Sequence, residues 1–383
     1  MTEKLYNLDD YREDMQRCMS CGLCNPLCPT AALCEWESGS PRGQIQLLKA
    51  MLDGEVKPNK YVASRLYNCT LCGYCLWRCP SAVKTTEAIK AGRALLVEKG
   101  GHLESLDELE SNLLKEKNPL GLPQTSRTDW TRLAKSRIPV KEKADVVYFP
   151  GCFAAMTEPG KEVAVATASI LDAAGLDWTI LGDKEWCCGD HLISSGKVAH
   201  VKDFVSHNLE AVKDTDAKTL VTSCPRCYRM FHQEYRRLVG EVGFNVLHIT
   251  QLVDDLISSK KLLPSKSVKL AAAYHDPCEL GRIMKVFEPP RRILKAIDGF
   301  ELKEFQRNRN TATCCGAGGV FRFTDYSNAL KLGVKRIDES IPLQVDAIVT
   351  ACPTCKLNLH EAASQVGSGV KILDVTEIVA RSL

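Results

Sequence analysis

Short apolar runs alternate with longer amphipathic segments through the second two thirds of the chain. The runs have the length of buried strands, and the amphipathic segments repeat their apolar residues with a helical period. The predicted strands are 144–149, 178–181, 218–222, 268–274 and 347–350. The predicted helices between them include 163–174 and 329–337. Alternating strands and helices predict open α/β sheets, of the Rossmann-like type.

The first part of the chain has a different pattern, which predicts a mostly helical domain. Ser40-Pro41 suits a helix start, and apolar residues from Ile45 to Leu52 give that helix one apolar face. Leucines among acidic residues predict a further helix over 103–117, and Asn118-Pro119 ends it. We predict an extended connector beyond it. The predicted limits are 1–91 for the helical domain, 92–143 for the linker, and 144–262 and 263–383 for the α/β domains.

Most of the nineteen cysteines fall into regular motifs. In each α/β half a single cysteine is followed along the chain by a Cys-Cys-Gly sequence and then by Cys-Pro-x-Cys. Equivalent cysteines are offset by 126, 127 or 128 residues, which indicates a duplicated domain. The first block is Cys152, Cys187, Cys188, Cys224 and Cys227, and the second is Cys278, Cys314, Cys315, Cys352 and Cys355.

Five thiols exceed the four ligands that a structural zinc ion needs. Adjacent cysteines can reach two irons or bridge them, which favours a larger iron-sulfur core. Several of these cysteines follow predicted strands, at the sheet edge where open α/β folds place their ligands. Three alternatives are weighed: a pair of buried structural thiols, zinc with a spare thiol, and a thioredoxin-like dithiol at Cys-Pro-x-Cys, where a helix should begin. The three further cysteines of each block disfavour the dithiol.

The helical domain carries two runs of the form Cys-x2-Cys-x2-Cys-x3-Cys-Pro. This is the bacterial ferredoxin signature, in which the fourth cysteine of each run ligates the cluster of the other run. The first predicted [4Fe-4S] cubane is held by Cys18, Cys21, Cys24 and Cys79. The second is held by Cys69, Cys72, Cys75 and Cys28. Cys34 fits neither run and is predicted to be a core thiol.

These spacings resemble the CCG domain, and the domain order resembles that of the heterodisulfide reductase D-type subunits and of related iron-sulfur subunits of glycolate, lactate and glycerol-3-phosphate oxidation complexes. The resemblance implies a noncubane [4Fe-4S] cluster in each five-cysteine block. In one relative, a succinate:quinone reductase subunit, a similar domain binds zinc. This chain has Glu279 after Cys278, where relatives often carry histidine, so any role of that histidine does not transfer.

Composition narrows the function further. The N-terminal residues lack an apolar export segment, and the chain has no apolar run of about 18 residues. We therefore expect a cytoplasmic protein, associated with a membrane only through a partner, whose cysteines bind metal. Cysteine-ligated cubanes add negative charge to a formal net charge of +3, which disfavours nucleic-acid binding.

Two classes of function remain open from the sequence. The chain is either an electron relay between a flavoprotein and another redox subunit, such as a membrane cytochrome or a quinone-reactive subunit, or itself a disulfide reductase. The glycine-rich loop after Cys315 is assigned to a cluster, because no nucleotide-binding fingerprint surrounds it. The candidate ligands or proton donors beyond the cysteines are His191, His232, His275 and His360.

Overall fold

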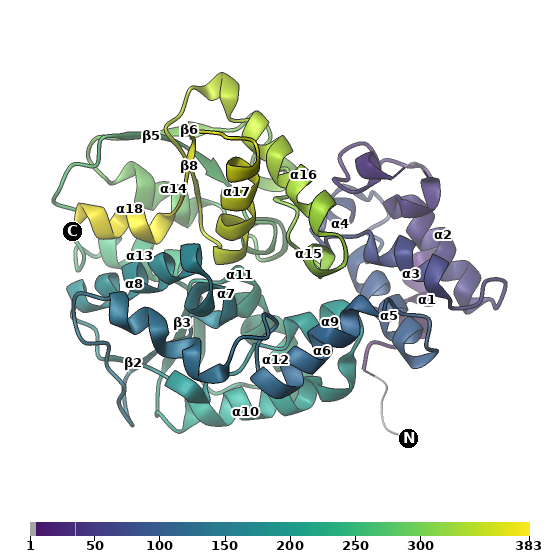
Figure 1. Cartoon of the computed structure of the whole chain (residues 1–383), viewed down its shortest axis with the longest axis horizontal. Coiled ribbons are helices and arrows are strands. Elements are labelled where there is room, and N and C mark those ends of the chain that lie inside the picture. The colour runs from purple at the N-terminus through teal and green to yellow at the C-terminus, as the bar shows by residue number, and fades with distance from the viewer. Residues whose placement is uncertain (1–4, 35) are drawn as a thin grey trace.

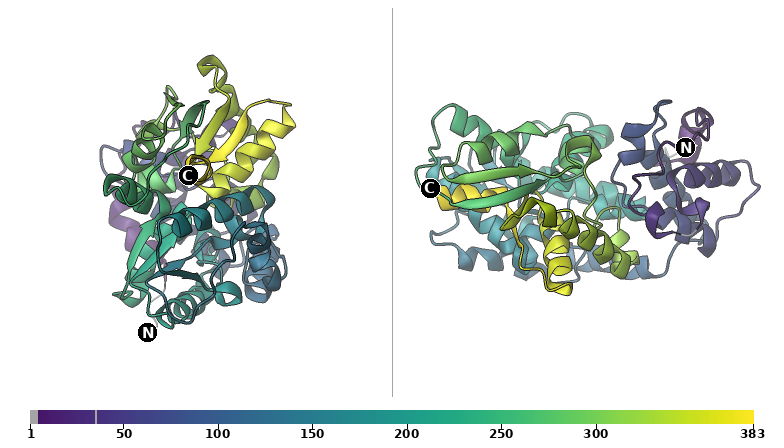
Figure 2. Two further views of the ribbon diagram at one scale, coloured as in Figure 1. Left: turned by 90° about the vertical axis from the view of Figure 1, so that its left-hand side faces the viewer. Right: turned by 90° about the horizontal axis from the view of Figure 1, so that it is seen from above.

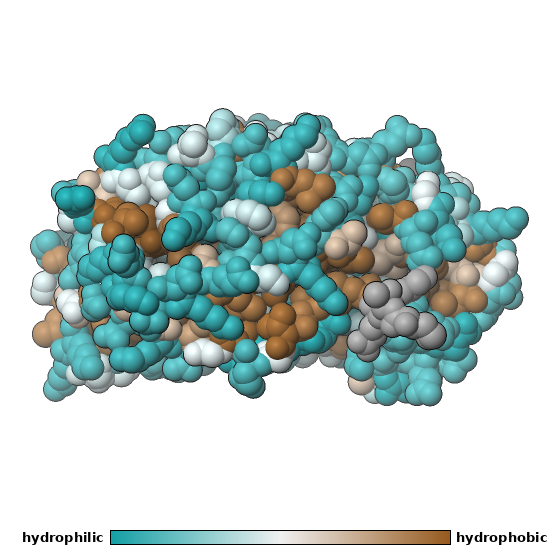
Figure 3. Space-filling view, turned by 90° about the horizontal axis from the view of Figure 1, so that it is seen from below, coloured by the Kyte–Doolittle hydropathy of each residue, from teal (hydrophilic) through white to brown (hydrophobic). Residues whose placement is uncertain are grey.

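The computed structural model describes residues 5–34 and 36–383. A helical domain lies at one end of the molecule, and two α/β units lie beside each other at the other end (Figures 1 and 2). The face seen in Figure 3 is mainly hydrophilic, with apolar side chains in small groups. Among the described residues, none of the helices has the length and apolar character of a bilayer span.

The N-terminal domain is helical, as predicted. Its packing comes from apolar helix faces that bury Leu48, Val62 and Leu66 completely. The predicted helix start is confirmed, because the Ser40 hydroxyl accepts a hydrogen bond from the Gly43 backbone N–H at 3.1 Å. The helices are α1 Arg12–Gln16, α2 Pro41–Leu52, α3 Lys60–Tyr67, α4 Tyr74–Arg78 and α5 Thr85–Glu98.

The linker contains more structure than predicted. Helix α6, Ser105–Glu116, confirms the helix expected there. The prediction of an extended connector is wrong over Gln124–Leu133, which forms a 3₁₀ helix. Trp130 from this helix is buried and packs edge-on against the Tyr148 ring, with 6.1 Å between ring centroids. Long-range packing therefore orders a segment that has no clear apolar period of its own.

Within the described residues, eight strands form two parallel four-stranded sheets, one in each half. The strand order is β2-β1-β3-β4 in the first sheet and β6-β5-β7-β8 in the second. The strands are β1 Val146–Tyr148, β2 Trp178–Ile180, β3 Thr219–Thr222, β4 Asn245–His248, β5 Leu270–His275, β6 Phe300–Glu304, β7 Ala347–Thr350 and β8 Lys371–Asp374. All the predicted strands are present within two residues of their predicted limits. Strands β4, β6 and β8 were not predicted.

Helices cover both sheets and join the halves to each other. Helix α8 packs against α17 and α18, and α13 packs against α14 and α18. The helices of the first half are α7 Gly151–Met156, α8 Glu158–Ala173, α9 Asp190–Ser195, α10 Val201–Lys213, α11 Pro225–Arg229, α12 Tyr235–Val239 and α13 Ile249–Ser258. Those of the second are α14 Glu288–Lys295, α15 Phe321–Thr324, α16 Tyr326–Asp338, α17 Pro353–Gln365 and α18 Val375–Ser382.

One buried arginine of α5 ties the helical domain to both halves. The Arg93 guanidinium donates to the backbone oxygens of Leu66 and Cys69 at 2.8 Å within its own domain. It also donates to Ser194 O in the first half at 2.7 Å and to Gly319 O in the second at 2.8 Å. A fully buried cation with four backbone acceptors fixes the relative position of all three parts.

Candidate iron-sulfur centres

The N-terminal cysteines lie close to one another. Burial, with the thiols of Cys18, Cys79 and Cys21, raises the pKa of Cys24 to about 11. Burial, with Cys69, Cys72, Cys28 and Cys24, raises the pKa of Cys75 well above its usual value. The division into two sets of four ligands stays a prediction. Glycines in the left-handed region, Gly22 at φ +75° and Gly73 at φ +70°, turn the chain after the second cysteine of each run.

Cys34 lies apart from both groups. Its Sγ is 3.7 Å from Arg65 Nη1 and 3.5 Å from Trp36 O. The thiol therefore has ordinary polar partners, but it is only half-buried, so the prediction of a core thiol is wrong.

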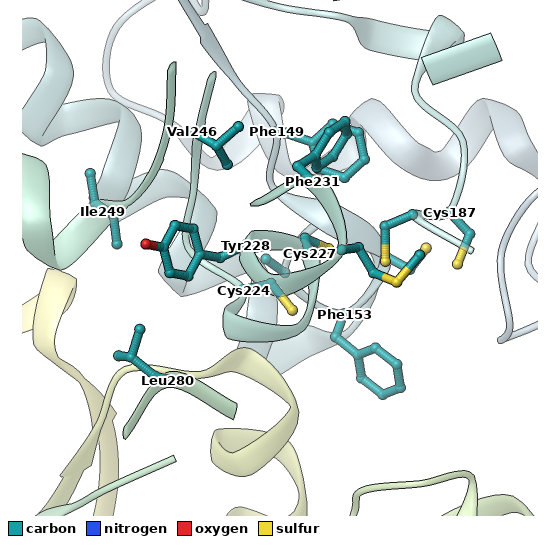
Figure 4. Close-up of a cluster of buried hydrophobic side chains, with 14 of the residues drawn as sticks. Phe149, Phe153, Cys187, Cys224, Cys227, Tyr228, Phe231, Val246, Ile249 and Leu280 are labelled. Carbon is teal, nitrogen blue, oxygen red and sulfur yellow. The ribbon is translucent and has the colours of Figure 1, made fainter. Parts of the chain in front are cut away.

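The first five-cysteine block converges in one buried site at the carboxyl edge of the first sheet. Cys187 hydrogen bonds with Cys152 and Cys188, and the series continues from Cys188 to Cys227 and from Cys227 to Cys224. Figure 4 shows Cys187, Cys224 and Cys227 with Phe149 and Phe231 on one side and Phe153 on the other.

The second block converges in the same way beside the second sheet. Cys315 and Cys355 bring their sulfur atoms to 3.3 Å. Cys314 interacts with Cys278 and with Cys315, and Cys355 interacts with Cys352. As predicted, both Cys-Pro-x-Cys segments begin a helix with the first cysteine as the N-cap and proline next. The Cys355 backbone N–H points at Cys352 Sγ, 3.4 Å away.

The donor set in each block fits a multinuclear metal centre. Five closely packed thiols, all buried except the half-buried Cys278 of the second block, cannot all ionise unless a cation balances their charge. Metal binding by cysteine requires the thiolate, and an iron-sulfur core supplies several positive centres in the space of one site. The second site also holds an imidazole of His275, whose ligand atom lies within 4.8 Å of those of Cys315 and Cys355.

Buried arginines stand next to these sites, and the sequence analysis did not predict them. Arg127, on the 3₁₀ helix of the linker, donates to Cys152 Sγ at 3.6 Å and forms a 2.8 Å ion pair with Glu185. Hydrogen bonding from Cys187 together with Arg127 lowers the pKa of Cys152 to about 7 despite burial. No local pattern in the sequence indicates this role of Arg127, because its partners Cys152 and Glu185 are distant in sequence.

Arg226, inside the first Cys-Pro-x-Cys, lies between the two five-cysteine sites. Burial alone lowers its pKa, but Asp190, Glu279, Cys224 and Cys352 together raise it above the usual value. Because Cys224 belongs to the first site and Cys352 to the second, one cation is close to both.

The second five-cysteine site also abuts the N-terminal domain. The thiols of Cys72 and Cys314 hydrogen bond, and with burial this raises the pKa of Cys72 well above its usual value. Gly318 explains the close fit, because a Cβ at this position would lie 2.4 Å from Thr70 O. The glycine-rich loop of the second half is thus the surface against which the ferredoxin loop packs.

A cavity of about 460 Å³ lies where the three parts of the chain meet. Both π-helical turns, Met230–Glu234 and Glu279–Ile283, contribute to its wall. Arg229 in this wall forms ion pairs with Glu234 at 2.9 Å and Glu279 at 2.7 Å. The cavity thus reaches the residue that follows Cys278.

The predicted histidines divide into two groups. His191 Nδ1 lies 3.9 Å from Cys187 Sγ, and His275 lies beside Cys315 and Cys355. His232 packs against the Tyr228 ring, and His360 is exposed on α17. Two of the four candidates therefore stand at the cysteine sites.

The fold and the cysteine sites define an iron-sulfur protein with a ferredoxin-like domain and two CCG domains. A model of the 4Fe-4S dicluster domain matches residues 14–83, and a model of the cysteine-rich domain (CCG) matches residues 146–232 and 272–360. These matches confirm the predicted fold class and indicate iron-sulfur clusters as the cofactors.

The relatives narrow the class to a family. The chain is 34% identical to the D-type subunit of the dihydromethanophenazine:CoB–CoM heterodisulfide reductase of Methanosarcina barkeri, over 97% of this chain and 94% of that protein. It belongs to the family of heterodisulfide reductase D-type subunits, and the resemblance stated from the cysteine spacing is confirmed. It is also 27% identical to the EtfAB:quinone oxidoreductase of Syntrophomonas wolfei, over 97% of this chain and 58% of that protein.

Among solved structures, glutamate racemase RacE1 of Bacillus anthracis aligns with 63% of this chain and 80% of its own at a TM-score of 0.31 and 15% identity. A similarity this weak carries no argument about function.

Proposed function

We propose that this chain is the iron-sulfur electron-transfer subunit of a multi-subunit oxidoreductase. The two groups of four cysteines each hold a [4Fe-4S] cubane, and each five-cysteine site holds a noncubane [4Fe-4S] cluster. Bound clusters of this kind supply reversible one-electron transfer. The protein determines which centres are neighbours, and it determines which polar and apolar side chains lie beside each centre.

The observation that carries this proposal is the contact between Cys72 and Cys314. It brings the ligands of an N-terminal centre into direct contact with those of the second five-cysteine site. Arg226 then stands between that site and the first one. The centres therefore form one series through the chain, as a relay requires.

The N-terminal end of this series is accessible to a partner. Cys21 is exposed, and so are Met19 and Leu23 beside it. We propose that a flavoprotein or another redox protein binds there, and that a membrane cytochrome or a quinone-reactive subunit is its counterpart in the complex. The name of the EtfAB:quinone oxidoreductase supports a partner of this kind. The chain would then work in the cytoplasm, at a membrane only through its partner.

Metal content tests the proposal first. Protein purified without oxygen should contain about 16 iron atoms if all four centres hold four irons each. About eight irons with stoichiometric zinc would overturn the assignment of the five-cysteine sites. The second test is rapid electron exchange with a flavoprotein, measured by the bleaching of the cluster absorbance.

A second candidate function is disulfide reduction by this chain itself. It is favoured by the similarity to the named reductase subunits and by the cavity next to Cys278. Against it, Phe153 and Phe323 enclose the His191 ring, at 5.9 and 5.5 Å between ring centroids, and so bring side chains of both halves into the space beside the first site. Turnover of a disulfide by the pre-reduced chain alone would favour the reductase. Exchange with a flavoprotein and no disulfide turnover would leave the relay.

A further inference from the structure

Each five-cysteine site contains one buried imidazole that the relay does not use. His275 is 1% exposed and His191 is 3% exposed. The two come from positions that are not equivalent in the duplicated halves. At the offset of 126 residues, His275 corresponds to Phe149 of the first half. At the offset of 127 residues, His191 corresponds to Gly318 of the second. The two imidazoles are therefore not copies of one ancestral histidine, and duplication does not explain why each site has a buried histidine.

At the second site an arginine fixes the tautomer of the histidine. Arg336 Nε donates to His275 Nδ1 at 3.1 Å, and a guanidinium has no acceptor. Because Nδ1 accepts this hydrogen bond it carries no proton, and the proton of the neutral ring is on Nε2. Among the described residues Nε2 is buried and has no hydrogen-bond partner. A buried N–H without an acceptor is costly, and a nitrogen of this ring lies within 4.8 Å of the sulfur atoms of Cys315 and Cys355.

The first site repeats this arrangement with the two nitrogens exchanged. Arg226 Nη1 donates to His191 Nε2 at 2.9 Å. The remaining proton of the neutral ring is therefore on Nδ1, which lies 3.9 Å from Cys187 Sγ. Phe153 stacks on one side of the ring and Phe323 meets it edge-on. The N–H of this imidazole consequently has a fixed direction.

A third buried histidine shows that such an arrangement is not general in this protein. His248 is fully buried, but its Nδ1 lies 2.8 Å from Thr250 Oγ1 and its Nε2 lies 3.3 Å from Ser223 O. Both of its nitrogens have ordinary oxygen partners. The two histidines that an arginine polarises are the ones beside the cysteine sites.

We propose that His275 and His191 are hydrogen-bond donors to the sulfur atoms of their iron-sulfur sites, each held in the donating tautomer by a buried arginine. The inference rests on the proposed function, since it needs a cluster in each site. The histidines are positioning residues and not ligands, because five thiols already surround each centre. An N–H directed at sulfur stabilises the more electron-rich state, so each donor raises the reduction potential of its own centre.

The test compares His275→Phe and His191→Phe in the anaerobically purified holoprotein. Phenylalanine is the residue that the first half carries at the position of His275, which makes it a suitable replacement in a buried site. We expect His275→Phe to keep the full iron content and to shift only the second site to a more negative midpoint potential in an EPR-monitored titration. His191→Phe should shift only the first site. Each variant thus contains its control in the unchanged site, and His360→Phe on the surface of α17 should shift neither.

A second readout identifies the hydrogen bond itself. The wild-type signal of each site should show an exchangeable proton coupling that deuterium oxide removes, and each variant should lose it at its own site. His275→Gln, which restores an N–H donor, should recover part of the potential. An unchanged potential and coupling would overturn the proposal, and so would loss of four irons, because that would make the histidine a ligand. About eight irons in the wild-type protein would instead contradict the proposed function.

Discussion

The two CCG halves share five cysteines, a sheet order and a helix-capping pattern, yet they surround their sites differently. The first site is enclosed by charged and aromatic groups, among them Arg127 and Phe153. The second site instead faces another domain through Gly318 and Gly319. A duplicated unit has thus kept its metal-binding framework and changed the residues around it.

The difference indicates that contact with the N-terminal domain determines which residues can stand beside each five-cysteine site. The loop that follows Cys315 must approach the ferredoxin loop closely, so it is built from glycine and has no room for a histidine like His191. The second site obtains its imidazole from the end of β5 instead. The first site has no ferredoxin loop to accommodate, and it can place larger side chains in the corresponding loop.

The largest effect should come from removing one thiol from each half. Cys314→Ser and Cys187→Ser should each lose about four of about 16 irons. Only Cys314→Ser should also prevent electrons supplied to the N-terminal domain from reaching the remaining five-cysteine site, because Cys314 stands beside Cys72. Iron analysis and stopped-flow reduction measure the two effects. Equal blockage in both variants would contradict the order of the sites.

The next effect concerns the ion pair that belongs to the first half alone. Arg127 and Glu185 are both 2% exposed, so Arg127→Met removes the ion-pair partner of a buried carboxyl group and leaves it with the Gly151 N–H. Breaking such a pair costs about 3–5 kcal/mol of unfolding free energy. Arg132→Met is the matched control, because Arg132 lies on the same helix with its side chain 82% exposed. Anaerobic denaturant unfolding should separate the two variants, and equal stabilities would show that the pair is dispensable.

Asp374 and His248 are the N-caps of the helices that follow the last strand of each half. Their contributions to the free energy of unfolding should change with pH in opposite directions. Burial raises the pKa of Asp374 to about 7, whereas burial lowers the pKa of its counterpart His248 to about 3. Asp374 therefore contributes stability that is fully present below pH 3.8 and is lost as the pH rises from there through 7. His248 contributes stability that is present above pH 6.5 and is lost as the pH falls through 3.

Asp374→Asn tests this contrast, because asparagine keeps the cap without the charge. Relative to the wild type, the variant should become steadily more stable as the pH rises from about 4 to about 7, and the difference should then level off. Each unit of the pKa shift is worth about 1.4 kcal/mol, so the gain should be at most a few kcal/mol. Unfolding curves across this pH range measure it, and parallel curves for the two proteins would contradict the assignment.

The smallest effect should come from Glu279, which occupies the position of Phe153 in the first half. Glu279→Gln removes one ion pair from Arg229. The side chain of Glu279 is 18% exposed, and Arg229 keeps Asp190 and Glu234 as partners, so the cost should be smaller than that of breaking the Arg127–Glu185 pair. Glu234→Gln should cost more, because Glu234 is 7% exposed and also accepts from Tyr6. A larger loss of stability in Glu279→Gln than in Glu234→Gln would show that Glu279 of the second half is the main partner of Arg229.

The cysteine spacing was sufficient to predict the domain order, the duplication and the grouping of thiols that the structure brings together. Spacing is a local property, and these motifs place cysteines at strand ends whose positions the apolar runs also reveal. Arg127 and Arg226 could not be predicted, since their roles come from contacts between segments far apart in sequence. Strand β6 was missed because its residues are only partly buried and alternate with charged ones.

Arg93 has a consequence for the order in which the protein is made. Its guanidinium needs Gly319 O, which lies 226 residues later in the chain. During synthesis the helical domain must therefore wait for most of the second half before its interior cation has all its acceptors. Until then the guanidinium has only the Leu66 and Cys69 carbonyls of its own domain as acceptors, and two of its four buried hydrogen bonds are missing. The final set of contacts around Arg93 is thereby tied to the completion of the whole polypeptide, and a chain that ends before Gly319 cannot form it.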